Sequence, residues 1–184
     1  MKSATLKSVL LEVVLYLLGG LLIFGLIQTT LLYAVVDGSS MEPTLHNAER
    51  LLVSKLTYRF GDPQRGDVII FPPPAQYNTG EDFVKRIIGL PGDTVEIKTG
   101  GTVYINGQAL SEPYVKDPAL NPFPETLVPE GSYFVLGDNR NDSLDSRYGF
   151  FVSRADIRGK VWLSVWPLSD FGTVSGHLAF VPSG

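Results

Sequence analysis

The chain has one long apolar run near its beginning and many short apolar runs afterwards. Residues 13–36 contain no charged side chain, and Lys2, Lys7 and Glu12 are the only charges before them. As a helix, this run would be about 36 Å long, enough to cross a hydrocarbon core of about 30 Å. Because a short basic flank favours the cytoplasmic side, the pattern predicts a single-pass protein of the cell membrane in three parts: a cytoplasmic segment over residues 1–12, a transmembrane anchor over 13–36 and an extracytoplasmic domain over 37–184.

A cleaved signal peptide is the alternative to a retained anchor. Its apolar core would be roughly 7–15 residues long, shorter than the run here, and a cleavage site with small residues would follow it. The best candidate for that site, Leu32-Tyr33-Ala34, places a bulky residue where a small one is required. Both criteria favour an anchor that stays in the membrane.

After residue 36 the pattern changes to short β-branched runs separated by glycine and proline, which is typical of a domain of many short strands. Thr99-Gly100-Gly101 separates two alternating runs and predicts a hairpin. Residues 111–131 contain five prolines and predict an irregular excursion, and the stretch after Pro167 is uninformative. Seven strands are expected, over residues 51–55, 67–71, 84–89, 94–98, 102–106, 132–136 and 160–165.

The composition excludes several classes of site. Lys and Arg total 15 against 19 Asp and Glu, so the chain is acidic, and no basic stripe suits a nucleic-acid partner. The chain has no cysteine, which excludes disulfides, thiolate zinc sites and cysteine peptidases. The two histidines, His46 and His177, cannot build a three-histidine metal centre. We therefore expect no metal, no cofactor and no nucleic acid.

Lysine is then the candidate for a general base. His46 lies in the same turn region as Ser40, and His177 lies in the uninformative tail, so a locally bonded or exposed position is favoured for both. A neutral amine can activate a serine, but a lysine must be buried to lose its proton near neutral pH. Lys85 lies in an apolar run that predicts a strand, although alternation alone does not distinguish it from Arg86.

The candidate nucleophiles directly follow the apolar run. Ser39 and Ser40 come after Gly38, which allows a sharp turn, and before Met41. An ordinary polar turn after a membrane helix would explain the same residues. Local chemistry does not choose between the two serines.

Four blocks in order give the chain a specific signature. The blocks are GSSMEPTL at 38–45, RGDVIIF at 65–71, VKRIIGLPGD at 84–93 and GDNRNDSLDSR at 137–147. Together they resemble the bacterial type I signal peptidases, also called leader peptidases, a family with a Ser/Lys dyad. The Trp166-Pro167-Leu168 ending is similar too.

The resemblance implies that Ser40 is the nucleophile and Lys85 the general base. The Ser40 N–H would form most of the oxyanion hole. Gly38 stands where some members carry an assisting hydroxyl, which leaves Ser39 as a candidate second donor. The implied supporting residues are Arg86 beside the lysine, Ser143 as the hydroxyl that orients the amine, Asp145 and Arg147 as an ion pair, and Asp138 with Arg140 in the same network.

The 137–147 block also has other interpretations. Its Asp, Asn, Gly and Ser residues are typical of a turn, and Asn141-Asp142-Ser143 matches a glycosylation sequon. A calcium loop is disfavoured by the arginines in and beside the cluster.

The implied substrate is a preprotein with an N-terminal signal peptide, bound as an added strand. Its small side chains, such as Ala, would enter shallow pockets. Core packing is the alternative role for the apolar pocket residues, and for Leu45 neither role is favoured. The implied binding residues are Val36, Asp37, Gly38, Met41, Leu45, Phe83 and Val84.

The implied fold is mainly β. We expect a coiled antiparallel β-sheet catalytic domain of the signal-peptidase and repressor-protease type, with a small inserted subdomain over about 97–130. The expected protein is a monomeric serine endopeptidase at the lipid bilayer.

Two rival functions stand beside this one. Self-cleaving repressor-type proteins share the Ser/Lys core, but they are soluble and carry a DNA-binding part, which the anchor and the acidic charge disfavour. A non-enzymatic, membrane-tethered β module would require Ser40 and Lys85 to be incidental.

Overall fold

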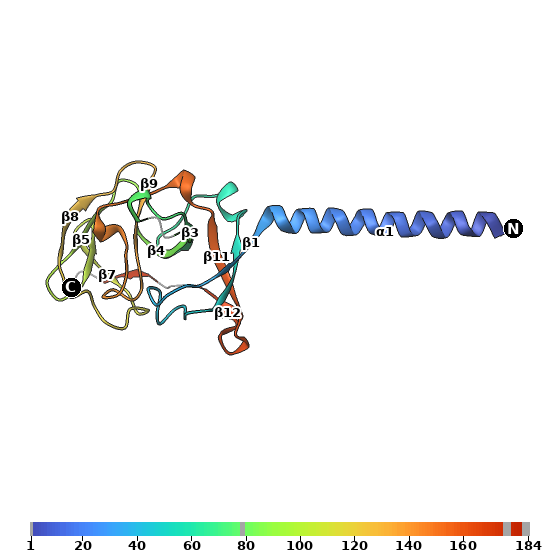
Figure 1. The fold of residues 1–184 in the computed structure, drawn as a ribbon. Coiled ribbons are helices and arrows are strands. Elements are labelled where there is room, and N and C mark those ends of the chain that lie inside the picture. Colours follow the sequence, from blue (N-terminus) through green and yellow to red (C-terminus); the bar gives the residue numbers. More distant parts are fainter. Residues whose placement is uncertain (1, 78–79, 175–177, 182–184) are drawn as a thin grey trace.

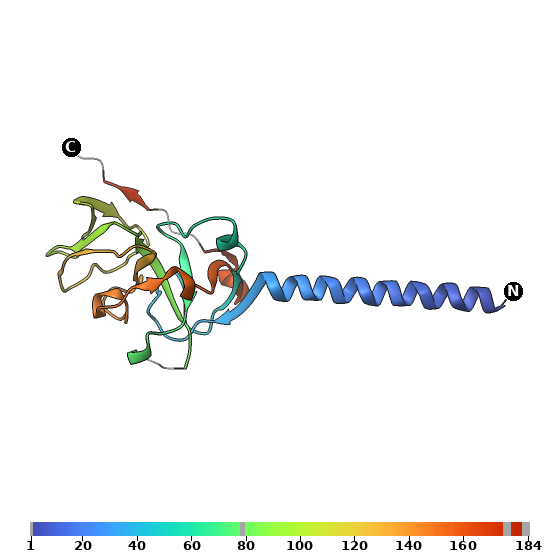
Figure 2. The ribbon, with the colours of Figure 1, turned by 90° about the horizontal axis from the view of Figure 1, so that it is seen from above.

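One helix and a β-rich body make up the protein. The computed structural model describes residues 2–77, 80–174 and 178–181. Helix α1 (Lys2–Thr30) projects away from the body, which holds the rest of the chain (Figures 1 and 2). The other described elements are strands and short 3₁₀ turns. The prediction of a mainly β fold with one N-terminal apolar helix is confirmed.

The first sheet is antiparallel and curled, and it carries most of the long strands. Strand β12 (Gly172–Thr173) pairs with β11 beside the main path. The order along that path is β1 (Leu31–Val35), β2 (Arg50–Ser54), β11 (Gly159–Trp166), β3 (Val68–Phe71), β4 (Phe83–Gly89), β9 (Ser132–Leu136) and β10 (Val152–Ser153).

The second sheet is smaller and lies at the end of the body away from α1 (Figure 1). Its pairs are antiparallel as well. The segment predicted as an insert, residues 97–130, contains three of its strands, and the sheet also takes in one strand before that segment and one from near the C-terminus. Its order is β13 (Ala179–Phe180), β7 (Gln108–Ser111), β6 (Val103–Ile105), β5 (Thr94–Ile97) and β8 (Phe123–Leu127).

Helix α1 ends earlier than the apolar run that predicted it. Residues 31–35 form β1, which pairs with β2 from Leu31 opposite Ser54 to Val35 opposite Arg50. The expectation of helix up to residue 36 is therefore wrong. An apolar run does not by itself distinguish helix from strand, and here a partner strand takes up the backbone hydrogen bonds. The remaining span, Ser8–Thr30, has a mean hydropathy of 2.5 and is long and apolar enough to cross a membrane.

The seven expected strands are all present, each with ends within one residue of the expected ones. Strand β8 was not expected, because it lies in the proline-rich excursion. It contains Pro124 and forms an edge of the second sheet, where a missing backbone donor is tolerated. The tail after Pro167, which gave no signal, contributes β12 and β13 as very short strands.

Two clusters of buried side chains hold the site in place. In one, residues from the turn between β1 and β2 pack against strands β2, β3 and β11: Val36, Met41, Leu45, Leu51, Val53, Val68, Ile70 and Val161. In the other, side chains of β4 and β9 pack against the second sheet and join the two sheets: Ile88, Phe134 and Leu136 against Val95, Ile97, Val103 and Ile105.

Gly89 is the point of closest approach between β4 and the second sheet. A Cβ atom there would lie 2.6 Å from Val95 Cγ2 and 2.9 Å from Val128 Cγ2. We expect Gly89→Ala to lower the free energy of unfolding by about 1–3 kcal/mol, because the packed core must shift. Urea unfolding of the full chain in detergent measures this. Gly61→Ala is the matched control, since a Cβ at Gly61 would meet only Thr57 O at 3.9 Å; equal losses in the two variants would contradict the expectation.

Candidate active site

Ser40 lies in the turn that connects β1 to β2. The base of the turn is closed by Val36 N–H, which donates to Glu49 O at 2.8 Å. Gly38 has a φ of +89°, a conformation that favours glycine, and its N–H donates to Asn47 Oδ1 at 2.9 Å. Ser40 is thus presented on a short, internally bonded turn and is only half-buried.

The same turn is bonded to the loop over residues 137–147. Asn139 N–H donates to Ser40 O at 3.1 Å, and Asn139 Nδ2 donates to Ser39 O at 3.2 Å. Ser39 Oγ donates to Asp142 Oδ2 at 2.6 Å. Two segments about 100 residues apart in sequence are therefore held as one unit around Ser40.

Lys85 reaches Ser40 from β4. Its side chain is only 4% exposed, and its Nζ lies 2.7 Å from Ser40 Oγ and 3.0 Å from Val84 O. The amine and the hydroxyl are therefore already at hydrogen-bond distance.

Burial also changes the chemistry of this amine. Desolvation lowers the pKa of Lys85 to about 8 from its ordinary value of 10.5, and the charges of Asp145 and Asp138 oppose that shift. Burial is the stronger effect because the charged form loses its hydration. Near neutral pH an appreciable fraction of the amine is neutral and able to accept a proton.

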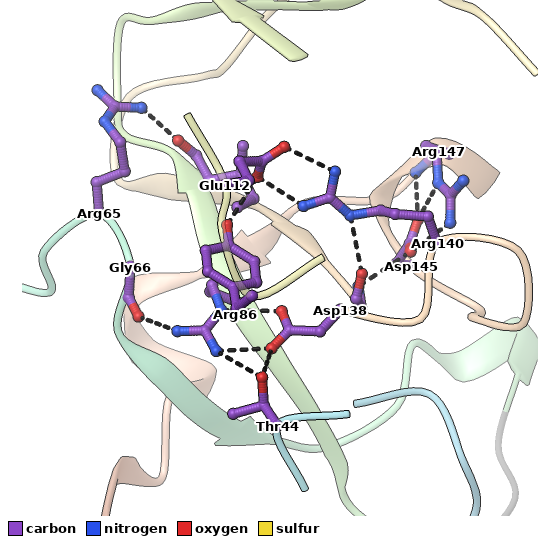
Figure 3. A network of polar contacts seen from close by, with 12 residues as sticks. Thr44, Arg65, Gly66, Arg86, Glu112, Asp138, Arg140, Asp145 and Arg147 are labelled. Carbon is purple, nitrogen blue, oxygen red and sulfur yellow. Dashed lines mark hydrogen bonds and ion pairs between the residues drawn. The ribbon is translucent and has the colours of Figure 1, made fainter. Parts of the chain in front are cut away.

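Arg86 faces away from Lys85 and is completely buried. Figure 3 shows its guanidinium bonded to Asp138, Gly66 and Thr44. It donates to both carboxylate oxygens of Asp138, at 2.8 and 2.6 Å, and to Gly66 O at 2.9 Å. The ring of Tyr114 lies 4.1 Å from the guanidinium carbon. A buried charge must be paired and hydrogen-bonded to be tolerated, and Arg86 meets both conditions.

Two further ion pairs hold the 137–147 loop (Figure 3). Arg147 forms a two-pronged contact with the buried carboxylate of Asp145, with both distances 2.8 Å. Arg140 donates to both oxygens of Glu112, at 2.8 and 2.6 Å. Gly137 connects these two pairs. Its N–H donates to Asp145 Oδ2, and its carbonyl oxygen accepts from Arg140 Nε.

A groove runs past Ser40 and Lys85. Its first part is a cavity of about 260 Å³. A second cavity of about 470 Å³ shares four lining residues with the first, so the two form one continuous depression. Besides the serine and lysine, the first cavity is lined by Val36, Asp37, Met41, Asp82, Phe83, Val84 and Leu144.

Comparison with known proteins identifies the family. The profile described as "Signal peptidase, peptidase S26" matches residues 8–166. The chain belongs to this signal peptidase family. It is 42% identical over 143 residues to the probable signal peptidase I-2 of Synechocystis sp., a match that covers 76% of this chain and 65% of that protein. It is 44% identical over 142 residues to the signal peptidase I of Leptolyngbya laminosa, covering 74% and 70%.

A solved structure is also similar. The crystal structure of a signal peptidase I from Enterococcus faecalis V583 is 40% identical, covers 55% of this chain and 97% of that one, and has a TM-score of 0.46. The relatives confirm the predicted family and the predicted enzyme class, a serine peptidase of the signal peptidase I type.

The structure separates the residues predicted for this signal peptidase site into two groups. Val36, Asp37, Met41, Phe83 and Val84 lie around Ser40 and Lys85. Three other predicted residues lie elsewhere or are otherwise engaged. Leu45 is fully buried in the core, Gly38 lines neither cavity, and the Ser39 hydroxyl donates to Asp142 and so is not free as an oxyanion donor.

Ser143 and the histidines were also singled out from the sequence. Ser143 Oγ is buried, and no hydrogen-bond partner is found for it within the described part of the chain. His46 has its main-chain N–H on Glu49 Oε2 at 2.7 Å, as expected for a locally bonded residue. His177 lies outside the described residues. Of the described residues, those whose ligand atoms are close enough to hold a metal ion are His46, Glu49 and Asp170, outside the groove.

Sequence reasoning missed Glu112, Tyr114 and Thr44, which surround the buried arginines. Tyr114 also donates to Glu112 Oε1 at 2.7 Å, and Thr44 donates to Asp138 Oδ2 at 2.5 Å. Glu112 and Tyr114 lie in the proline-rich excursion, where no periodic pattern marks a buried position. One signal in the sequence could have pointed to Glu112. Arg86 and Arg140 each need a carboxylate partner if they are buried, so more than one acidic residue had to be expected near them.

Removal of one charge from the Arg86–Asp138 pair tests its importance. We expect Asp138→Asn to lower the free energy of unfolding by about 3–5 kcal/mol, because Arg86 would stay buried without its counter-charge. Urea unfolding in detergent measures this. Asp62→Asn is the matched control: Asp62 is 87% exposed and lies 4.0 Å from Arg154, so a change below about 0.5 kcal/mol is expected. A small loss in both variants would show that the buried pair is not required.

Proposed function

We propose that the protein is a membrane-anchored signal peptidase in which Ser40 is the nucleophile and Lys85 the general base. The observation that carries the proposal is the 2.7 Å separation of Lys85 Nζ and Ser40 Oγ, with an amine whose pKa burial lowers to about 8. A general base works best when its pKa is near the working pH. Signal-peptide-bearing preproteins are the substrates that membership of this family implies.

In the first half of the reaction, the neutral Lys85 amine takes the proton of the Ser40 hydroxyl. Ser40 Oγ forms a bond to the scissile carbonyl carbon, and the carbonyl oxygen becomes the oxyanion. Lys85 then gives its proton to the leaving nitrogen as the C–N bond breaks. The products of this half are the free amine of the mature protein and an ester between Ser40 and the signal peptide.

In the second half, Lys85 removes a proton from water, and the water oxygen attacks the ester carbonyl. Collapse of the intermediate breaks the bond to Ser40 Oγ, which recovers its proton from Lys85. The signal peptide leaves as a carboxylic acid, which releases its remaining proton to water and becomes a carboxylate. One lysine therefore acts as base and then as acid in each half of the reaction.

The Ser40 N–H is the proposed oxyanion donor. No acceptor for it is found among the described residues, so it is available to a developing negative charge. The Ser39 hydroxyl would first have to leave Asp142, and we therefore assign it no part in this proposal. Ser143 is proposed to orient the amine. A buried hydroxyl without a partner in the described residues supports that role, because it could meet the lysine when the substrate displaces the Lys85–Ser40 contact.

The substrate is proposed to bind as an extended strand along the groove. On β4, Phe83 to Lys85 pair with β3, whereas pairing with β9 begins only at Arg86. The opposite edge of Phe83–Lys85 thus has no strand among the described residues and can accept one. The small volume of the cavity at Ser40 favours small side chains such as Ala next to the scissile bond.

The membrane part of the proposal depends on α1. The 23 residues Ser8–Thr30 would span about 34 Å as a helix, and its side chains are exposed rather than covered by the β body. Lys55 binds the end of this helix through contacts to Gln28 O and Thr30 O. Nearby strands expose Tyr33 and Trp162, the residue types that gather at membrane surfaces. We propose that the N-terminus is cytoplasmic and the β body extracytoplasmic.

Substitution of the dyad tests the proposed mechanism. We expect Ser40→Ala and Lys85→Met each to reduce cleavage of a purified preprotein in detergent by at least about 1,000-fold, because the nucleophile or its base is lost. The cut is followed on gels and mapped by mass spectrometry. Ser169→Ala and Lys116→Met change exposed residues of the same types and are expected to keep wild-type rates. Cleavage that survives in either dyad variant, with the fold checked by circular dichroism, would disprove the mechanism.

The pH dependence tests the state of the amine. Protonated Lys85 cannot act as a base, so kcat/KM is expected to rise about tenfold per pH unit below pH 8 and to level off above it. Between pH 6 and pH 9 the increase should be about 100-fold, measured with an uncharged peptide substrate. The Lys116→Met variant should give the same profile as the wild type. A flat profile over this range would show that no amine with a pKa near 8 controls the reaction.

A further inference from the structure

A second cluster of polar side chains lies outside the groove, at the other end of the turn that carries Ser40. His46 and Glu49 come from that turn, and Asp170 comes from the 3₁₀ turn Leu168–Asp170. His46 Nδ1 lies 3.7 Å from Glu49 Oε2 and 3.7 Å from Asp170 Oδ2. All three ligand atoms lie within 4.8 Å of one another.

The cluster has two carboxylates and no strong cation. Glu49 is only 2% exposed. Within the described ranges, neither Glu49 nor Asp170 forms an ion pair with a lysine or arginine; the imidazole of His46 is the partner of both. A buried carboxylate is costly without a paired positive charge, so this cluster has a deficit of positive charge.

Ser164, on β11, supplies an independent observation. It is 2% exposed, and its hydroxyl has no hydrogen-bond partner within the described residues. Ser164 lines the same cavity of about 260 Å³ as His46, Glu49 and Asp170. A buried hydroxyl is normally hydrogen-bonded, and one that borders a polar cavity can bind an ion or an ion-bound water. The cavity is large enough for both, since a water takes about 30 Å³.

We propose that His46, Glu49 and Asp170 form a binding site for a divalent cation. The hydroxyl of Ser164 would bind the cation directly or form a hydrogen bond with a water bound to it. One imidazole nitrogen and two carboxylate oxygens suit Zn²⁺, which has four ligands at about 2.0–2.2 Å. Tetrahedral ligands at that distance lie about 3.4 Å apart, and the two 3.7 Å separations are close to this value. Calcium would require about 6–8 oxygen ligands.

The site would connect two segments that are distant in sequence. It would join the turn after Ser40 to the segment that leads into β12. Thr44 borders the same cavity and donates to Asp138, the partner of Arg86. The bound cation would thus stabilise the turn without contacting the substrate, and the inference does not depend on the proposed peptidase mechanism.

The rival explanation is a protonated His46 that lies between the two carboxylates as an ion pair. Both explanations use the same three residues, but they differ in their response to metal. An imidazolium needs no cation, and added Zn²⁺ would then leave the stability of the protein unchanged.

The test uses the full chain in detergent, without a polyhistidine tag, after treatment with EDTA and its removal. Titration with ZnCl₂ by calorimetry gives the stoichiometry, and thermal unfolding gives the stabilisation. We expect one Zn²⁺ per chain and a rise in Tm of about 5–10 °C when the free Zn²⁺ concentration is 100 times Kd. His46→Gln and Asp170→Asn should weaken binding by at least tenfold. At the same Zn²⁺ concentration they should also reduce the rise in Tm by at least about half.

The controls replace residues of the same types. His177→Gln changes the other histidine of the chain, and Asp156→Asn changes an exposed carboxylate outside the cluster; both should bind Zn²⁺ like the wild type. The His46 and Asp170 side chains are 57% and 32% exposed, so their variants should fold, which circular dichroism checks. The absence of binding to the wild type, or binding to either cluster variant as tight as to the wild type, would overturn the proposal.

Discussion

The buried amine of Lys85 must stay beside the Ser40 hydroxyl, and the elements around the two residues hold it there. Lys85 Nζ lies 2.7 Å from Ser40 Oγ, and burial lowers its pKa to about 8 although Asp145 and Asp138 act in the opposite direction. Each of these carboxylates is bonded to an arginine, Asp138 to Arg86 and Asp145 to Arg147. Desolvation is the stronger effect on the lysine, because the charged amine loses its hydration. The arginines hold the two carboxylates in fixed ion pairs beside this buried amine.

A third ion pair connects the two sheets. Glu112 follows directly on β7 of the second sheet, and it binds Arg140 of the 137–147 loop. Tyr114 covers the guanidinium of Arg86 on β4. Apolar packing between Ile88 and the second sheet completes this junction. The second sheet is thus part of the support of the site, and it explains why buried arginines can be tolerated in a small β domain.

The turn between β1 and β2 carries two polar sites. Ser40 lies in its first half, bonded to the 137–147 loop through Asn139. His46 and Glu49 lie in its second half, next to Asp170. Met41 and Leu45 are buried between the two, so the turn is held by apolar packing in its middle and by polar contacts at both ends. The turn that carries Ser40 is therefore held rigidly, because movement of either end would break contacts in the core.

The apolar helix, the seven strands with short β-branched runs and, through four blocks in order, the family could be predicted from the amino-acid sequence. These features depend on local patterns, which a reader of the sequence can see directly. The end of α1 at Thr30 depended on the pairing of residues 31–35 with β2, and the edge strand β8 depended on a partner in β5. The contact of Ser39 with Asp142 and the pairing of Arg140 with Glu112 join residues that are far apart in sequence. The burial of Leu45 depends on the strands that pack over it. These features follow from the three-dimensional packing, because the energy of a buried charge or hydroxyl is set by the neighbours that the fold brings to it.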